Sequence, residues 1–117
     1  EADVMNVVGD VAGKNCLIVD DMCDTGGTIC KVAKALHDAG ANEVLACFTH
    51  AVLSGKAAEN ISTSYLKKVI VTNTIPLGEA VSSLVDSGRI EVLSVGKLLA
   101  SAINSIHDET SVSSLFI

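Results

Sequence analysis

Residues 19–28 read VDDMCDTGGT and set three carboxylates directly before a glycine-rich turn. The turn is Thr25-Gly26-Gly27-Thr28, and an amphipathic helical pattern follows it. Glycines permit positive φ angles and close approach, so successive backbone N–H groups can converge on an anion. The start of a helix adds about half a positive charge, and both threonines offer hydroxyl donors. We therefore interpret residues 25–28 as part of a cradle for a phosphate monoester.

The carboxylates suit a different part of a ligand. Asp20 and Asp21 follow an apolar run directly, and adjacent residues at the end of a strand point to opposite faces. A carboxylate is a strong acceptor that suits sugar hydroxyls or metal-bound water. The combination predicts a phosphorylated sugar, with its phosphate on the amides and its hydroxyls on the acids. Sugar-phosphate chemistry of this kind commonly uses Mg²⁺ as well.

Two other motifs and one plainer interpretation compete with the assignment of a phosphorylated-sugar site. Asp20 to Asp24 match D-D-x-x-D, a diphosphate signature of all-α prenyl synthases, but here they follow a β-type run and precede two glycines. Residues 9–14, GDVAGK, resemble a P-loop, yet they are one residue short and lie before a strand instead of after it. An ordinary N-capped helix start with solvated charges is the plainest alternative, and it applies best to Asp24 alone.

Apolar runs and helical periodicity predict where the supporting elements lie. The runs are short and continuously apolar, as in parallel strands covered on both faces, and they span residues 16–19, 44–48, 69–71 and 90–95. Helical patterns fall between and after them, at residues 29–36 (ending at Gly40), from Ser54 as N-cap through 61, at 80–85 (ending at Gly88), and at 95–106. This alternation predicts an α/β fold with an open, mostly parallel sheet flanked by helices. The acidic loop then lies at the carboxyl end of the first strand, where such sheets bind ligands.

Composition narrows the class of partner. The 117 residues are 49% hydrophobic and carry a net charge of −6, so no basic field exists for nucleic acid or an anionic membrane surface. The longest apolar runs fall well short of the ~18 residues of a membrane span. Four cysteines without a C-x-x-C pair are typical of free thiols in a reducing compartment, which predicts a cytoplasmic location.

The acidic loop is similar to the phosphoribosyl pyrophosphate (PRPP) motif of the type I phosphoribosyltransferase fold. The resemblance extends to the C-terminal part of ribose-phosphate pyrophosphokinases, also called PRPP synthases. Four stretches carry it, in family order: VMNVVGDVAGKNCLIVDDMCDTGGTI (4–29), THAVLSG (49–55), VTNTIP (71–76) and ETSVSSLF (109–116). The last two are not shared by ordinary phosphoribosyltransferases.

The resemblance implies a reaction and a division of labour. A PRPP synthase moves the β,γ-diphosphoryl group of ATP to the 1-hydroxyl of ribose 5-phosphate with Mg²⁺, and so forms PRPP and AMP. Family members bind the 5-phosphate with the residues that match Asp24, Thr25, Gly26, Gly27 and Thr28, and the matches of Asp20 and Asp21 face the ribose hydroxyls. The family's ATP-binding residues, metal-binding histidine and catalytic Lys-Arg loop would precede Glu1, so no catalytic or metal-ligating residue is expected in this chain.

The tail carries the remaining implied site. Residues 1–106 are expected to form the phosphoribosyltransferase-like domain of a longer protein, and residues 107–117 a tail that packs on an absent N-terminal domain or on a partner subunit. In the family this tail contributes to an allosteric site for ADP or phosphate at a subunit interface of a homo-oligomer. Ser111, Ser113 and Phe116 match that site, with tail polarity as the alternative for the two serines.

Two further functions stay open at this point. One is a phosphoribosyltransferase that consumes PRPP, which the loop alone does not exclude. The other is a non-catalytic regulatory subunit on the same fold, like the PRPP synthase-associated proteins.

His50 is one more candidate for contact with the ligand, because it lies at the end of the second predicted strand, near the expected cleft.

Overall fold

The fold is a parallel sheet with helices along one side. The computed structural model describes residues 6–116, and in this part of the chain the sheet has strand order β1-β2-β3-β4. The strands are β1 (Asn15–Cys23), β2 (Glu43–Ala51), β3 (Leu66–Thr72) and β4 (Ile90–Leu93). All neighbouring pairs are parallel. The prediction of an open, parallel α/β sheet is therefore confirmed.

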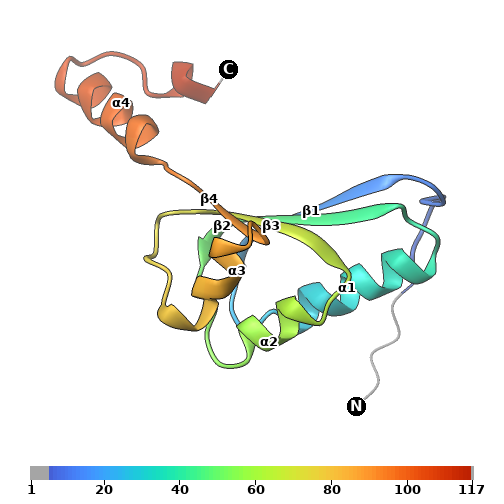
Figure 1. Ribbon diagram of the computed structural model, residues 1–117. Helices are drawn as coiled ribbons and strands as arrows, with labels where there is room; N and C mark the ends of the chain where they lie inside the picture. The colour runs from blue at the N-terminus through green and yellow to red at the C-terminus, as the bar shows by residue number, and fades with distance from the viewer. Residues whose placement is uncertain (1–5, 117) are drawn as a thin grey trace.

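The helices follow the strands in alternation. They are α1 (Gly27–Asp38), α2 (Ala57–Ser62), the 3-10 turn η1 (Glu79–Val81), α3 (Ser82–Asp86), α4 (Gly96–His107) and the 3-10 turn η2 (Ser113–Phe116). Figure 1 shows α1, α2 and α3 beneath the sheet, with α4 projecting away from it beyond β4. None of the helices within residues 6–116 is long and apolar enough to cross a membrane.

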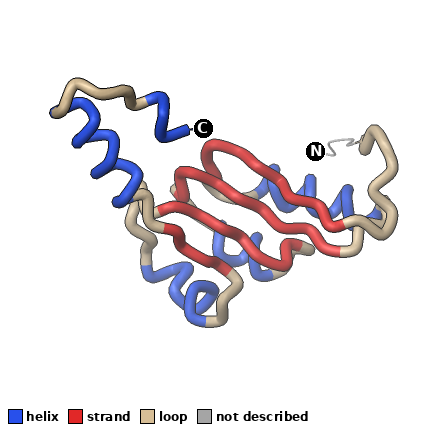
Figure 2. The backbone as a smooth tube through the Cα atoms, turned by 90° about the horizontal axis from the view of Figure 1, so that it is seen from above, coloured by secondary structure: helices blue, strands red, loops and turns tan. Residues whose placement is uncertain are grey.

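The strands are covered on one face of the sheet only, which corrects the expectation of coverage on both. The strand order follows the chain order, and right-handed crossovers that advance steadily in one direction place every connecting helix on the same face. Phe48, Val69 and Val71 on that face are at most 1% exposed, whereas Leu17 and Val19 are 60% and 72% exposed. Figure 2, viewed onto the sheet, shows the strands with the helices behind them.

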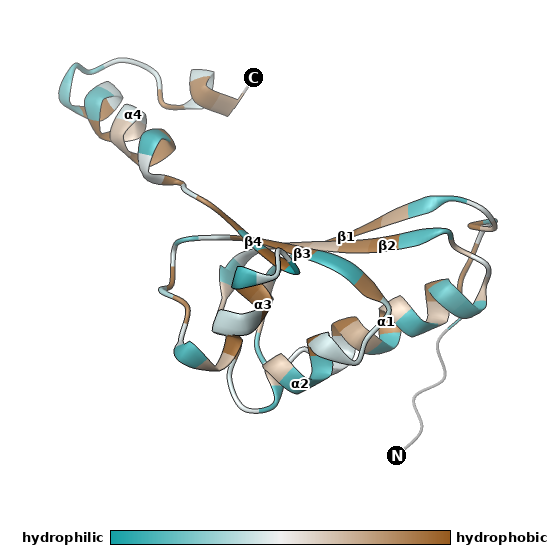
Figure 3. Cartoon of the chain, viewed as in Figure 1, coloured by the Kyte–Doolittle hydropathy of each residue, from teal (hydrophilic) through white to brown (hydrophobic). Residues whose placement is uncertain are grey.

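Helix α4 forms an arm that contributes nothing to this core. It has no buried residue, and its apolar side chains are 41–69% exposed: Leu98, Leu99, Ile103 and Ile106. Figure 3 shows the corresponding brown stripe along α4, next to the brown tail of η2. The predicted boundary at residue 107 falls at the last residue of α4.

Strand β1 is longer than its apolar run, which is a correction to the predicted boundary at Val19. Its pairing with β2 continues in unchanged register to Cys23, opposite Ala51, so Asp20 and Asp21 lie within the strand. Backbone pairing decides a strand's length, and β1 is an edge strand of this sheet, where charged side chains are common. The last strand is shorter than predicted: the apolar run extends to residue 95, but β4 ends at Leu93.

Helix ends were predicted with mixed success. Gly40 ends α1 as expected: it adopts φ 95°, its N–H reaches the carbonyl of His37 at 2.9 Å, and Ala41 N–H reaches that of Leu36 at 3.0 Å. Ser54 is not the N-cap of α2, whose N-cap is Lys56 and has no side-chain capping bond. The Ser54 hydroxyl instead donates to Asp24.

Arg89 ties three segments together beside β3. Its Nε donates to the carbonyl of Leu66 at 2.8 Å, and one terminal nitrogen donates to the carbonyls of Ile61 and Ser64 at 2.8 and 3.2 Å. These carbonyls belong to the end of α2, the α2–β3 turn and the start of β3. The guanidinium therefore satisfies polar atoms that the turn leaves without a backbone partner.

We predict that Arg89→Met lowers the free energy of unfolding by about 2–4 kcal/mol, because half-buried carbonyls lose a charged donor. Chemical denaturation of the 117-residue chain measures this. Lys67→Met is the matched control, since it removes a nearby cation that pairs with Glu43 in an exposed ion pair of small expected value. Equal losses for the two variants would contradict the structural role of Arg89.

A second prediction concerns the two faces of the sheet. Val71→Ala removes methyl groups that are 1% exposed and should cost about 2 kcal/mol, whereas Val19→Ala, at 72% exposed, should cost less than about 0.5 kcal/mol. Both free energies come from the same denaturation experiment, and the two substitutions are chemically identical. A large cost for Val19→Ala would mean that this face is covered in solution.

Candidate functional site

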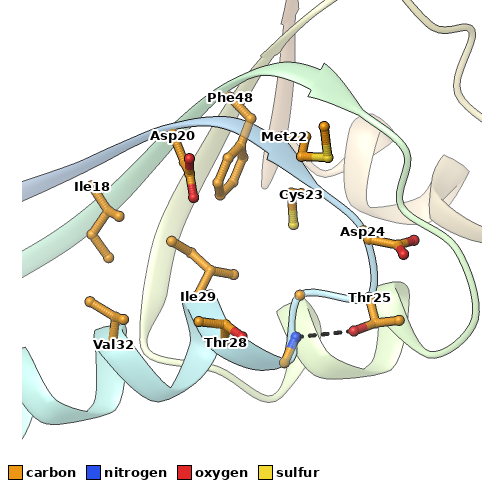
Figure 4. A pocket seen from close by; sticks show the side chains of 12 residues that line it. Ile18, Asp20, Met22, Cys23, Asp24, Thr25, Thr28, Ile29, Val32 and Phe48 are labelled. Carbon is orange, nitrogen blue, oxygen red and sulfur yellow. Dashed lines mark hydrogen bonds between the residues drawn. The ribbon is translucent and has the colours of Figure 1, made fainter. Parts of the chain in front are cut away.

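The predicted ligand loop joins β1 to α1 through three residues, Asp24, Thr25 and Gly26. Around it lies a hollow of about 350 Å³, which Figure 4 shows from close by. Its lining includes six of the seven predicted binding residues and an apolar floor: Ile18, Asp20, Met22, Cys23, Asp24, Thr25, Gly26, Gly27, Thr28, Ile29, Val32 and Phe48. The structure thus brings the acids and the glycine-rich turn together at one open site.

Asp20 and Asp21 do not share an orientation. Asp20 points toward the hollow in Figure 4, next to Phe48, which is its register partner in β2. Asp21 is exposed and is not among the lining residues. Its backbone N–H donates to the Asp20 carboxylate at 2.8 Å. Opposed side chains are what adjacent positions of a strand require, so only Asp20 is placed to meet a ligand in the hollow.

The turn has the backbone geometry of an anion cradle. Gly26 is the N-cap of α1 with φ 79°, ψ 0°, a left-handed conformation that favours glycine. Gly27 N–H donates to Thr25 Oγ1 at 3.4 Å, drawn as a dashed line in Figure 4, and Cys30 N–H closes the first helical turn on the Gly26 carbonyl. The first N–H groups of a helix have no acceptor within the helix. No acid occupies the first turn of α1, so its positive end is not neutralised by its own side chains.

The thiol beside the loop is not a reactive group. Burial, together with the charges of Cys30, Asp24 and Asp20, raises the pKa of Cys23 to about 11. Burial also raises the pKa of Cys30. Both cysteines therefore stay protonated at neutral pH and supply neither a nucleophile nor a thiolate ligand. All four cysteines of the chain are free thiols, as predicted.

Metal ligands are not concentrated in this part of the protein. Residues 6–116 contain no group of three or more His, Cys, Asp or Glu side chains that could hold a metal ion. Asp20 is the only carboxylate besides Asp24 in the lining of the hollow. The site therefore does not form a metal cage from the described side chains alone.

His50 does not line the hollow. Its Nδ1 lies 2.8 Å from the Thr74 hydroxyl, which itself donates to the carbonyl of Thr49 at 3.2 Å. The ring therefore contributes to the junction between the ends of β2 and β3. The structure gives no support to a ligand contact for His50 at the loop.

Two residues that contact the loop were missed as site residues. Ser54 pairs with Asp24 through both its hydroxyl and its N–H, the latter reaching the Asp24 carbonyl at 3.0 Å. Asn60 Nδ2 donates to the Thr25 carbonyl at 2.8 Å. They lie 30 and 35 residues from their partners, so no local spacing in the sequence signals the contacts.

Ser111, Ser113 and Phe116 lie beyond the end of α4, away from the ligand loop (Figure 1). The hydroxyl oxygens of Ser111 and Ser113 are 2.8 Å apart, and Ser114 Oγ donates to the Ser111 carbonyl at 2.9 Å. Phe116 is 70% exposed. The three predicted tail residues are thus close in sequence and accessible.

Comparison with known proteins gives a consistent result along the chain. Residues 1–117 match the family described as the phosphoribosyl synthetase-associated domain. Proteins named ribose-phosphate pyrophosphokinase are similar to it: one from Nitrosomonas europaea is 52% identical over 117 residues, and one from Haemophilus influenzae is 48% identical over 115. These alignments cover 100% and 98% of this chain but 36% of each relative.

A solved structure agrees with these sequence matches. The crystal structure of phosphoribosylpyrophosphate synthetase from Mycobacterium smegmatis superposes with a TM-score of 0.77 at 40% identity, over 87% of this chain and 33% of that one. The chain spans about a third of the length of the curated relatives it matches. With the parallel sheet, the loop geometry and a family match over every residue, the chain belongs to the phosphoribosyl synthetase-associated domain family.

Proposed function

We propose that this chain is the ribose 5-phosphate-binding part of a ribose-phosphate diphosphokinase. The complete protein would transfer the diphosphoryl group of ATP to the 1-hydroxyl of ribose 5-phosphate and release PRPP and AMP. The observation that carries the proposal is the gathering of residues 20 and 22–28 around one hollow, in a chain about 50% identical to proteins named ribose-phosphate pyrophosphokinase. ATP binding and the groups that activate it are assigned to residues outside this chain.

The ligand would be held at its two ends. The N–H groups of the turn and the Thr25 and Thr28 hydroxyls would bind the 5-phosphate, where the α1 dipole favours negative charge. Asp20 would accept hydrogen bonds from ribose hydroxyls across the hollow, whereas Asp21, on the opposite face of β1, is assigned no contact with a ligand there. Catalysis would then come from holding the 1-hydroxyl in line with ATP, because this chain offers no nucleophile of its own at the site.

Mg²⁺ belongs to the proposal only for the complete protein. It is commonly held by one or two carboxylates together with substrate phosphates, and it neutralises charge that develops on a transferred phosphoryl group. Asp20 fits such a role as a single carboxylate, and the other contacts would come from the substrates and from outside this chain.

The tail is proposed as part of an effector site in an oligomer. Ser111 and Ser113 offer two adjacent hydroxyls, and Phe116 offers an exposed ring, a set that suits ADP or inorganic phosphate. The apolar face of α4 is the surface that we assign to contact with the rest of the protein or with another subunit. Both assignments rest on the family resemblance and on exposure.

A regulatory subunit is the alternative function. It would keep the fold and could keep the loop, but it would not support turnover. No observation in the described residues favours it over the enzyme, and an experiment on turnover separates the two.

Binding of ribose 5-phosphate tests the site itself. We predict that the chain binds ribose 5-phosphate in calorimetry and that Asp24→Ala with Thr28→Ala abolishes the heat signal, because the double variant loses a loop contact and a phosphate donor. Asp86→Ala with Thr110→Ala is the matched control: it removes the same groups at exposed positions away from the hollow. No binding by the folded wild-type chain at millimolar ligand would count against the site.

A chimaera tests turnover. We expect activity, measured as AMP release from ATP and ribose 5-phosphate, when this chain replaces the matching 36% of the Nitrosomonas europaea protein. The same chimaera with Asp24→Ala and Thr28→Ala should lose at least about a hundredfold in kcat/KM, since a contact that holds the loop and a phosphate donor are both removed. A folded chimaera that binds ribose 5-phosphate without AMP release would favour the regulatory subunit.

A further inference from the structure

We infer that Ser54 and Asn60 are positioning residues of the phosphate site. Together with the Leu53 N–H they hold three successive peptide groups of the β1–α1 loop with their N–H groups toward the ligand. The inference rests on the proposed function, because it concerns how that site binds the phosphate end of its substrate. It assigns a purpose to the β2–α2 segment and to α2, neither of which lines the hollow.

Three consecutive carbonyl groups of the loop accept hydrogen bonds from the same region of the chain. The carbonyls of Cys23 and Asp24 accept from the N–H groups of Leu53 and Ser54, each at 3.0 Å. The next carbonyl, that of Thr25, accepts from the side-chain amide of Asn60 at 2.8 Å. The Ser54 hydroxyl adds a fourth bond, to the Asp24 carboxylate.

Because a peptide bond is planar, the hydrogen bonds to these carbonyls also fix the direction of the N–H groups in the same peptides. The structure has no cis peptide bond among the described residues, and in a planar trans peptide the C=O and N–H vectors are antiparallel. Fixing the carbonyls of residues 23, 24 and 25 toward the β2–α2 segment therefore turns the N–H groups of Asp24, Thr25 and Gly26 away from it. These residues line the hollow. Successive N–H groups with one direction form an anion-binding nest.

We call the hydrogen bonds from Leu53, Ser54 and Asn60 to residues 23–25 the clamp. Helix α2 anchors it to the buried core. Ala57 and Ile61, on either side of Asn60, are fully buried, and Asn60 N–H bonds the Lys56 carbonyl at 2.8 Å. The Asn60 carbonyl in turn accepts from the Cys30 thiol of α1 at 3.4 Å, so Asn60 contacts both the loop and the first turns of α1.

The turn packs closely against α2 at Gly26. A Cβ added at Gly26 would come within 3.8 Å of Ile61 Cγ1 and 3.9 Å of Asn60 Cβ, and the φ of 79° is itself unfavourable for other residues. The left-handed turn that exposes the amides and the hydrogen bond from Asn60 thus occur at the same point of contact. Loss of the Asn60 donor leaves the Thr25–Gly26 peptide free to rotate.

NMR titration of the ¹⁵N-labelled 117-residue chain with inorganic phosphate and with ribose 5-phosphate tests the clamp. In the wild-type chain the amide protons of residues 24–28 should move most, with the same pattern for both probes. Ser54→Ala with Asn60→Ala should weaken both affinities by about tenfold or more, because the Asn60 donor to the Thr25 carbonyl and the Ser54 hydroxyl bond to the Asp24 carboxylate are lost. The backbone N–H groups of Leu53 and Ser54 remain in this variant. Ser54→Thr keeps a hydroxyl and should stay nearer to wild type.

Matched controls separate positioning from general loosening. Ser62→Ala and Asn42→Ala remove a hydroxyl and an amide whose recorded partners, Glu59 and Asn15, lie outside the loop, so affinity should stay within about twofold. Thermal unfolding of every variant is recorded alongside. A weaker affinity in a variant that melts near the wild-type temperature is the result that a merely structural role does not produce.

The remaining outcomes are decisive as well. Wild-type binding with unchanged affinity in the folded double variant would overturn the clamp and leave the proposed function intact. Wild-type shifts centred away from residues 24–28 would overturn it even if the double variant failed to fold. Absence of binding of either probe by the folded wild-type chain would overturn the clamp together with the proposed site.

Discussion

The parallel pairing of β1 with β2 is the constraint on which the site depends. It runs in one register from Asn15 opposite Glu43 to Cys23 opposite Ala51, so both strands end at the same level of the sheet. The residues that follow each strand must then leave the sheet side by side. Asp24 and Ser54 meet for this reason, although 30 residues separate them in the chain. The conformation of the β1–α1 ligand loop thus depends on the β2–α2 segment beside it, because parallel strands end at the same edge of the sheet.

The same order of strands explains why the core is one-sided. Each right-handed crossover moves one strand further in the same direction, so α1, α2 and α3 accumulate on one face. Apolar strand residues on the other face therefore remain exposed, as at Leu17 and Val19, and α4 extends from the end of β4 with its apolar side uncovered. A chain that is 49% hydrophobic has more apolar surface than its three short helices can cover.

The sequence predicted the elements of the fold, and the gathering of residues 20 and 24–28 at one place, better than the contacts between them. Continuous apolar runs located every strand, and glycine at position 40 marked the end of α1, because these signals are local. Coverage of both faces was wrong, since a continuously apolar strand cannot reveal whether its second cover lies in the same chain. Ser54 was assigned to the nearest helix as a cap, while its partner was Asp24 in another connection. The role of Asn60 was equally invisible, because its bond to Thr25 exists only after the sheet forms.

The structure also resolves the conflict between acids and a phosphate cradle in one short segment. Asp24 directs its carboxylate to the Ser54 hydroxyl, and Asp20 accepts the N–H of Asp21. Cys23, buried beside them, remains a neutral thiol at neutral pH because its pKa is about 11. No acid stands in the first turn of α1. The acids closest to the turn therefore accept hydrogen bonds from partners other than the first amides of α1, which leaves those amides available to a ligand in the hollow.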